Sequence, residues 1–207
     1  MGYVVLHFKK ALGNDAGTSA HIERTIHPKN ANESRTYLNR ELIGFPERVK
    51  NRTEAIQRRI ENAGITRKIG KNQVRAIGVM LSGSPENMKR IEEAGHLNDW
   101  CADNVDWLKQ TFGAENLVSA VLHRDETTPH IHATIVPIVT GERRKAREEK
   151  LAEGKKKYRK KNPNTARLCA DDVMARDKLK GYQGRYAQRM QVYGLQRGIE
   201  GLQSKAY

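Results

Sequence analysis

The sequence predicts an α+β fold, in which a β-sheet that includes one hairpin is covered by helices. Four short stretches are rich in β-branched and aromatic residues and have the character of strands. Longer segments repeat apolar residues at three- and four-residue steps, as amphipathic helices do. Two of the strands are separated by only the residues 124–129, a length that suits an antiparallel hairpin.

The N-terminal part predicts a strand, a loop, a helix and a second strand. Residues 3–8 form the first strand, and the glycine-containing loop that follows is expected to deliver His21. Residues 47–62 are charged but place apolar residues near helical spacing, so they predict a solvated amphipathic helix that stops at Gly64. The stretch 73–82 is apolar on both faces, which is typical of a central strand.

The middle of the chain predicts a helical segment over residues 84–112. Ser84 is its expected N-cap, Pro85 its first residue, and Gly95 the point at which it can divide into two helices. Its tryptophans, Trp100 and Trp107, are interpreted as core residues in preference to residues that stack on a nucleobase.

The hairpin strands are expected at 116–123 and 130–138. The next segment, 141–162, holds 11 Lys and Arg against 4 Glu, and we expect a mobile basic arm there. A last helix is predicted after Asp171 or Asp172 as its N-cap, with Gly194 at its end and a short turn beyond it.

The length of 207 residues suits one domain with or without an extension. We divide it into a core at 1–140, a basic flexible loop at 141–165, and a C-terminal helix and turn at 166–207 that complete the domain. No obvious closing element precedes the last residue, so we expect the front part of a longer protein.

The charge of the chain predicts an anionic partner. Lys and Arg number 38 against 24 acidic residues, a formal net charge of +14, so nucleic acid is the first candidate and an anionic membrane surface the second. No apolar run approaches the roughly 18 residues needed to span a membrane, and no signal peptide is recognisable, which predicts a cytoplasmic protein without membrane insertion. Cys101 and Cys169 are too few and too far apart for a disulfide framework or a cysteine zinc site.

The stretch 123–132, HRDETTPHIH, gathers three of the seven histidines. Side chains alternate along a strand, so His130 and His132 point to one face, and a hairpin partner His123 opposite or nearly opposite His130 would lie about 5 Å away. Three neutral imidazoles leave coordination positions open, as in catalytic metal sites. Asp125 or Glu126 is placed to orient a histidine or to act as a base. The alternative interpretation is polar surface. Ligand type alone suggests zinc, but imidazole also accepts manganese, so the identity of the metal stays open.

Two motifs carry a resemblance to a known family. HRDETTPHIH followed by ATIVPI resembles the motif of HUH endonucleases, in particular that of the MobV/Pre (Mob_Pre) family of plasmid and transposon mobilisation relaxases, HxDExTPHxH. The family's second motif, H-N-x-R, S-R, L-N and L, is matched except that Ile22 replaces its Asn; the matching residues are His21, Arg24, Ser34, Arg35, Leu38, Asn39 and Leu42. The segment YGLQRGIEG resembles the region after the family's last helix, so the likeness covers nearly the entire chain.

The resemblance implies a central antiparallel sheet of about five strands with helices packed on one side. It implies that His123, His130 and His132 bind a divalent cation, with Mn²⁺ or Mg²⁺ expected first and Zn²⁺, Co²⁺ or Ni²⁺ as alternatives. It also assigns the nucleophile, a histidine in this family, to His21. The local alternatives are Tyr3, Tyr37 and His27, each of which also has a packing or loop role available.

The implied activity is a metal-dependent, strand-specific nick at a transfer origin (oriT), made by transesterification and leaving a 5′-phosphoryl-histidine link. Its substrate is single-stranded or supercoiled DNA, and the conjugative transfer machinery is an expected partner. Glu126 would hold the His21 tautomer or take its proton, and Asp125 would steady His123 or the turn. The expected phosphate contacts are Arg24, Arg35 and Arg67. The alternatives are a metal-dependent nuclease that hydrolyses single-stranded DNA, and a noncatalytic basic nucleic-acid-binding protein with a structural metal.

Overall fold

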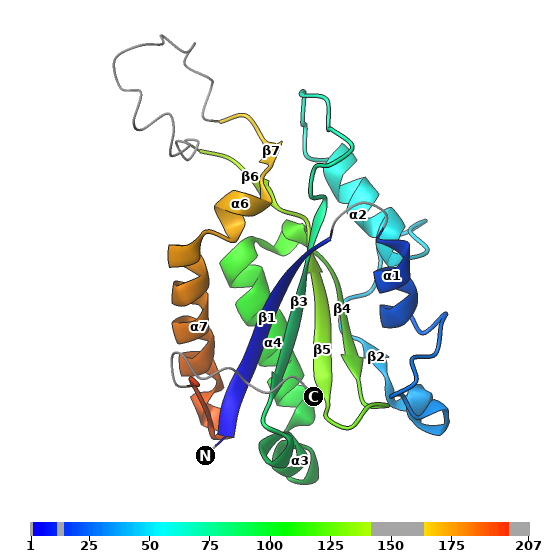
Figure 1. The fold of residues 1–207 in the computed structure, drawn as a ribbon, viewed down its shortest axis with the longest axis vertical. Coiled ribbons are helices and arrows are strands. Elements are labelled where there is room, and N and C mark those ends of the chain that lie inside the picture. The colour runs from blue at the N-terminus through cyan, green and yellow to red at the C-terminus, as the bar shows by residue number, and fades with distance from the viewer. Residues whose placement is uncertain (1, 12–14, 142–163, 199–207) are drawn as a thin grey trace.

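A computed structural model of the chain describes residues 2–11, 15–141 and 164–198, and Figure 1 shows a central sheet between two sets of helices. The six strands of the sheet lie in the order β2–β4–β5–β3–β1–β8. Their bounds are β1 Gly2–Ala11, β2 Arg40–Glu41, β3 Ala76–Gly83, β4 Leu117–His123, β5 His130–Ile135 and β8 Leu195–Gln196. Neighbouring strands are antiparallel except for β8, which pairs parallel with β1. The predicted α+β class with a central antiparallel sheet is confirmed, and β8 adds a parallel edge strand.

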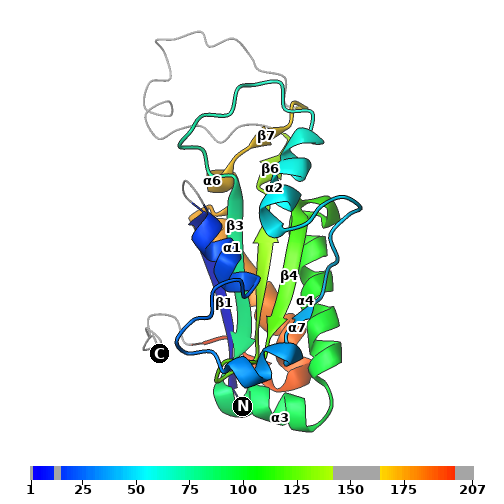
Figure 2. The same ribbon diagram turned by 90° about the vertical axis from the view of Figure 1, so that its right-hand side faces the viewer.

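One face of the sheet carries the main core. The helices α3 (Pro85–Glu93), α4 (Leu97–Phe112) and α7 (Arg176–Met190) lie on this side in Figures 1 and 2. Alternate strand residues supply the apolar surface, because side chains alternate between the faces of a strand. The buried residues of this core include Leu6, Ile77, Leu81, Ile131, Ile135, Trp100, Trp107, Leu108, Tyr186 and Met190. The prediction that both tryptophans are core residues is confirmed.

The opposite face is covered in part by α1 (Ala16–Ile22) and α2 (Arg52–Glu61), and α1 stands in front of this face in Figure 2. Helices therefore lie on both sides of the sheet and not on one side only. Two short 3-10 helices, η1 (Glu33–Leu38) and η2 (Ala114–Asn116), precede the edge strand β2 and the strand β4. The remaining elements are a two-stranded ribbon of β6 (Ile138–Val139) and β7 (Arg167–Leu168), with α6 (Ala170–Val173) and η3 (Gln191–Tyr193).

Several predicted boundaries hold, with local adjustments. Helix α2 begins later than residue 47 because Asn51 is its N-cap and accepts a hydrogen bond from the Glu54 N–H. Gly95 divides α3 from α4 with a φ of +76°, which glycine adopts at little cost. Ser84 is the N-cap residue of α3, as predicted, but its hydroxyl accepts from the Tyr3 N–H at 2.8 Å and forms no capping bond to the helix.

Three local predictions were wrong. His21 lies in helix α1 and not in a loop, because buried Ser19 and Ile22 seat this short helix on the sheet. Asp171 and Asp172 do not cap the long C-terminal helix: they lie in α6, where they pair with Lys10 and Arg167 respectively, and α7 begins after Ala175. The turn expected after Gly194 begins instead with strand β8.

The predicted basic arm falls mostly on residues 142–163, which lie outside the described residues, so the division at 141–165 stays a prediction. Within the described ranges, none of the helices combines the length and the apolar character that crossing a membrane requires.

Candidate active site

Four histidines converge on the sheet face opposite the main core, and we call His21, His123, His130 and His132 the histidine cluster. His123 on β4 pairs directly opposite His130 on β5, as predicted, and His132 follows two residues later on the same face. The ring centroids of the three strand histidines are 4.9–5.3 Å apart. The register of the β4–β5 hairpin thus brings three imidazoles together on one face of the sheet.

Helix α1 brings His21 to the same place from a distant part of the sequence. Its ring centroid is 5.4 Å from that of His132 and 6.0 Å from that of His123. The His21 side chain keeps 38% of its surface exposed, so a substrate can reach it. Burial and the neighbouring Arg24 lower the His21 pKa below its ordinary value, and the ring is therefore neutral near pH 7.

The connection between β4 and β5 carries two carboxylates that a single arginine holds. The Arg24 guanidinium donates to both Asp125 oxygens at 2.8 and 2.7 Å and to Glu126 Oε1 at 2.7 Å. The side chains of Arg24 and Asp125 are only 6% and 0% exposed. Arg24 follows the end of α1 with a φ of +53°, a left-handed conformation that non-glycine residues seldom adopt. This backbone turn aims its side chain back at the site, where it also donates to the His21 carbonyl at 2.8 Å.

Glu126 lies at the centre of the cluster. Its Oε1 atom is 4.0 Å from His21 Nε2, 4.0 Å from His123 Nδ1 and 3.8 Å from His130 Nε2. The Glu126 carboxylate therefore lies on the Nε2 side of the His21 ring. From there it can accept a hydrogen bond from an Nε2–H group, whereas a proton on Nδ1 points away from it.

Hydrogen bonds fix the strand histidines in defined orientations. His123 Nε2 donates to the Ile22 carbonyl at 3.0 Å, while its Nδ1 accepts from Arg24 at 3.0 Å. His130 Nδ1 donates to the Thr128 carbonyl at 2.9 Å, which leaves Nε2 facing Glu126. Such bonds to the second ring nitrogen set the tautomer of a metal-binding histidine.

The cluster contains two compact groups of possible metal ligands among the described residues. One is His21, His123 and His132, and the other is His123, Glu126 and His130; the ligand atoms within each group are at most 4.8 Å apart. The predicted triad is divided between them, with His123 common to both. Burial lowers the pKa of His123 to about 4 and, together with the neighbouring histidines, lowers that of His132 well below 6.5, so both rings are neutral and have a lone pair to offer.

The predicted phosphate contacts lie in three different settings. Arg24 uses its donors on Asp125, Glu126 and His123, as described above. Arg35 is half-buried on η1. Arg67 is exposed in the connection from α2 to β3, which Figure 1 shows at the end of the sheet opposite the β4–β5 connection. The structure thus brings Arg24 into the site and leaves Arg67 far from it.

The alternative nucleophiles lie on the surface of the protein. Tyr3 on β1 is 43% exposed, Tyr37 on η1 is 81% exposed, and His27 is exposed in the segment after α1. Among these and His21, the ring that lies against His123 and His132 is that of His21. The geometry favours His21.

Sequence reasoning missed the amides that support the carboxylates. Asn39 donates to Asp125 at 2.7 Å and accepts from the Arg124 N–H, and Asn30 donates to Glu126 Oε2 at 2.8 Å. Asn39 matches a position of the second motif, but the motif does not predict that its side chain supports Asp125. Asn30 carried no signal.

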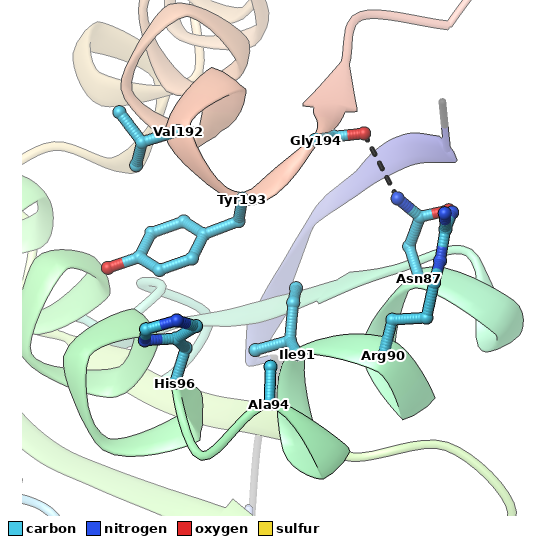
Figure 3. A pocket seen from close by; sticks show the side chains of 8 residues that line it. All are labelled: Asn87, Arg90, Ile91, Ala94, His96, Val192, Tyr193 and Gly194. Carbon is cyan, nitrogen blue, oxygen red and sulfur yellow. Dashed lines mark hydrogen bonds between the residues drawn. The ribbon is translucent and has the colours of Figure 1, made fainter.

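A separate hollow of about 270 Å³ lies between the end of α3 and η3 (Figure 3). Asn87 donates to the Gly194 carbonyl at its rim, and Tyr193 and Ile91 form its apolar wall. The hollow shares no lining residue with the histidine cluster.

Comparisons with known proteins place the chain in a family. The family model described as plasmid recombination enzyme, Mob_Pre, matches residues 1–165. A 65 kDa protein of Zymomonas mobilis subsp. mobilis is 31% identical over 205 residues, which cover 96% of this chain and 30% of that protein. Plasmid recombination enzyme type 3 of Staphylococcus aureus is 28% identical over 162 residues, which cover 72% of this chain and 37% of that protein. This chain thus spans about a third of the length of these relatives.

A solved structure shares the fold. The crystal structure of the MobM relaxase domain (MOBV; Mob_Pre), Mn-bound and with plasmid pMV158 oriT DNA, superposes with a TM-score of 0.75 at 23% identity. The superposition covers 99% of this chain and 95% of that one. The family model extends over most of the sequence, and it shows that the chain belongs to the plasmid recombination enzyme (Mob_Pre) family.

Proposed function

We propose that this chain is a DNA relaxase that nicks one strand at a transfer origin by transesterification. The nick would leave a covalent 5′-phosphoryl-histidine link and initiate mobilisation of a plasmid or transposon. The observation that carries the proposal is His21, a neutral and accessible imidazole that helix α1 holds against His123 and His132. The net charge of +14 and the oriT DNA bound to MobM support the choice of substrate.

The donor set fits a divalent cation held by His123, His130 and His132. Imidazole nitrogens together with the Glu126 carboxylate can hold manganese, the metal present in the MobM crystals. The ion would supply positive charge to the phosphate oxygens as charge builds on them. His123 has its lone pair on Nδ1, where Arg24 now donates, so binding through this atom requires Arg24 to give up that bond.

His21 would attack the phosphorus with the lone pair of Nε2, the ring nitrogen that faces the site. A nitrogen–phosphorus bond forms, the bond from phosphorus to the 3′ oxygen breaks, and its electron pair stays on that oxygen. The ring must then lose one proton and the 3′ oxygen must gain one. The attacking Nε2 carries no proton, so the proton that leaves is the one on Nδ1, and solvent can accept it because the His21 side chain is 38% exposed. Glu126, 4.0 Å from Nε2 and bonded to Arg24, would orient the attacking nitrogen.

The hydrolytic nuclease is the second candidate for the same cluster. It would use the same metal ligands, but water would attack the phosphorus and no protein–DNA bond would form. The exposed position of His21 beside the strand histidines favours the covalent reaction, because a nuclease that uses water has no need of a fourth imidazole there.

The test is to look for the covalent link. Supercoiled plasmid that carries the DNA flanking this gene is incubated with the protein, with and without Mn²⁺, and the products are trapped in detergent and digested to find a nucleotide-bearing peptide. We expect a Mn²⁺-dependent nick and an adduct on the peptide that contains His21. His21→Ala should abolish the adduct, His130→Ala should weaken Mn²⁺ binding, and His27→Ala is the matched control that should retain both.

An adduct on Tyr3 or Tyr37 would retain the relaxase but refute the nucleophile. Nicking without any adduct would establish the hydrolytic nuclease, and DNA binding without nicking would establish the noncatalytic protein.

A further inference from the structure

Arg52 is a fully buried arginine that joins the element carrying His21 to the strand carrying His130 and His132. It is the first residue of α2 and is 0% exposed. Its Nε donates to Thr134 Oγ1 on β5 at 2.6 Å, and its Nη1 donates to Ser19 Oγ on α1 at 2.8 Å. We propose that Arg52 is a positioning residue that fixes His21 relative to the metal-binding strand, an inference that rests on the proposed function.

The contacts of Arg52 reach both ends of α1. Its Nη1 forms an ion pair with Asp15, the N-cap residue, and its backbone N–H donates to Glu23 Oε1 at the C-cap at 2.6 Å. Ser19, in the middle of the helix, also lies 3.2 Å from the hydroxyl of Thr53. The first two residues of α2 therefore hold α1 at its start, its middle and its end.

Helix α1 depends on such external contacts. It has only seven residues, whereas isolated helices shorter than about 12 residues are marginal in water. The ring of His21 must nevertheless be held steadily against two other imidazoles. The orientation of the nucleophile is thus set by what α1 touches, and Arg52 supplies the polar part of that contact.

The geometry of Arg52 places its bonds close to the reacting groups. Ser19 is two residues before His21, and Thr134 is two residues after His132 on the same face of β5. A planar guanidinium presents donors in fixed directions, so one side chain defines the distance between the helix and the strand. A lysine would keep the charge but would not present that fork.

The burial of this arginine is costly, which points to a role for its side chain beyond filling space. Removing a guanidinium from water is costly, and its Nη2 atom is buried without a hydrogen-bond partner among the described residues. An apolar residue would fill the same space at lower cost. An apolar residue could not form the hydrogen bonds that Arg52 donates to Thr134 and Ser19.

The test measures chemistry and binding separately in Arg52→Lys and Thr134→Val. We expect single-turnover nicking of the plasmid to slow by about 10- to 100-fold, because a displacement of about 1 Å at a reacting group has effects of that size. Mn²⁺ affinity and DNA affinity should stay within about twofold of wild type, since the β4–β5 histidines are untouched. Arg59→Lys, on the same helix but bonded to Asn116, is the matched control and should keep the wild-type rate.

A second readout does not depend on nicking. Hydrogen exchange of the α1 amides should become faster in Arg52→Lys and in Ser19→Ala, whereas exchange in α7 should not change. The proposal is overturned if both Arg52→Lys and Thr134→Val nick within twofold of wild type, or if DNA affinity falls in step with the rate. If wild type forms no adduct, the proposed function fails. The role of Arg52 is tested separately, because it is refuted if hydrogen exchange in α1 is unchanged in Arg52→Lys.

Discussion

The ion pair between Arg24 and Asp125 leads to a stability prediction for Arg24→Met. Methionine keeps much of the side-chain volume but removes every donor that Arg24 offers to Asp125, whose carboxylate is 0% exposed. The variant therefore leaves a buried charge without its ionic partner. Asn39 and Thr36 still donate to that carboxylate, at 2.7 and 3.3 Å, and limit the damage.

The size of the effect follows from these contacts. Removing one partner of a buried ion pair costs about 3–5 kcal/mol, and the two remaining donors place Arg24→Met near the lower end. A loss of about 3 kcal/mol lowers the melting temperature of a domain of this size by roughly 6–12 °C. Asp125→Asn should cost less, about 1–2 kcal/mol, because Arg24 retains Glu126 as its charged partner.

Urea unfolding of the two single variants and the double variant measures the coupling. The double variant should lose less than the sum of the single losses, by at least about 1.5 kcal/mol, because it buries no unpaired carboxylate. Strictly additive losses, or a loss below about 1 kcal/mol for Arg24→Met, would show that water or a rearranged neighbour replaces the guanidinium and that the pair contributes little.

Three further predictions concern titration and packing. Burial alone would raise the Asp125 pKa, but Arg24 and Asn39 hold it well below its usual value. The contribution of the Asp125 carboxylate to stability is therefore complete above about pH 4 and is lost as the pH falls further. The free energy of unfolding of Asp125→Asn should vary less than that of wild type between about pH 4 and pH 2. The lowered His21 pKa predicts that the single-turnover rate declines only below about pH 6.5, and a decline centred above that value would contradict it. Ile131→Ala, at a site with 0% exposure, should cost about 3–4 kcal/mol in urea unfolding without changing which DNA strand is cut.

The hairpin of the site could be predicted because its signals are local. Strand alternation places His130 and His132 on one face, and a connection of six residues fixes which strands pair, so His123 meets His130 as expected. The position of His21 beside them came only from the family resemblance. Nothing in residues 16–22 indicates by itself that they lie against β5.

The elements that were mispredicted are short and depend on distant partners. Helix α1 is seven residues long and is held by Arg52, and β8 is two residues long and exists because Gly2 and Tyr3 pair with it. Neither length is enough to establish a hydrophobic period. The role of Arg52 had no signal either, since an arginine at the start of a charged helix ordinarily faces water.

The pairing of β8 with β1 has a consequence for how the chain is synthesised. The outer side of β1 is covered by β8, through Gly2 and Tyr3, and by α7, whose Gln183 donates to the Leu6 carbonyl. A ribosome completes β1 long before it makes either of these covers, which lie much later in the sequence. The nascent chain therefore carries an open strand edge until α7 and β8 have been made, and the charges of Lys9 and Lys10 on that strand discourage it from pairing with another chain during that time.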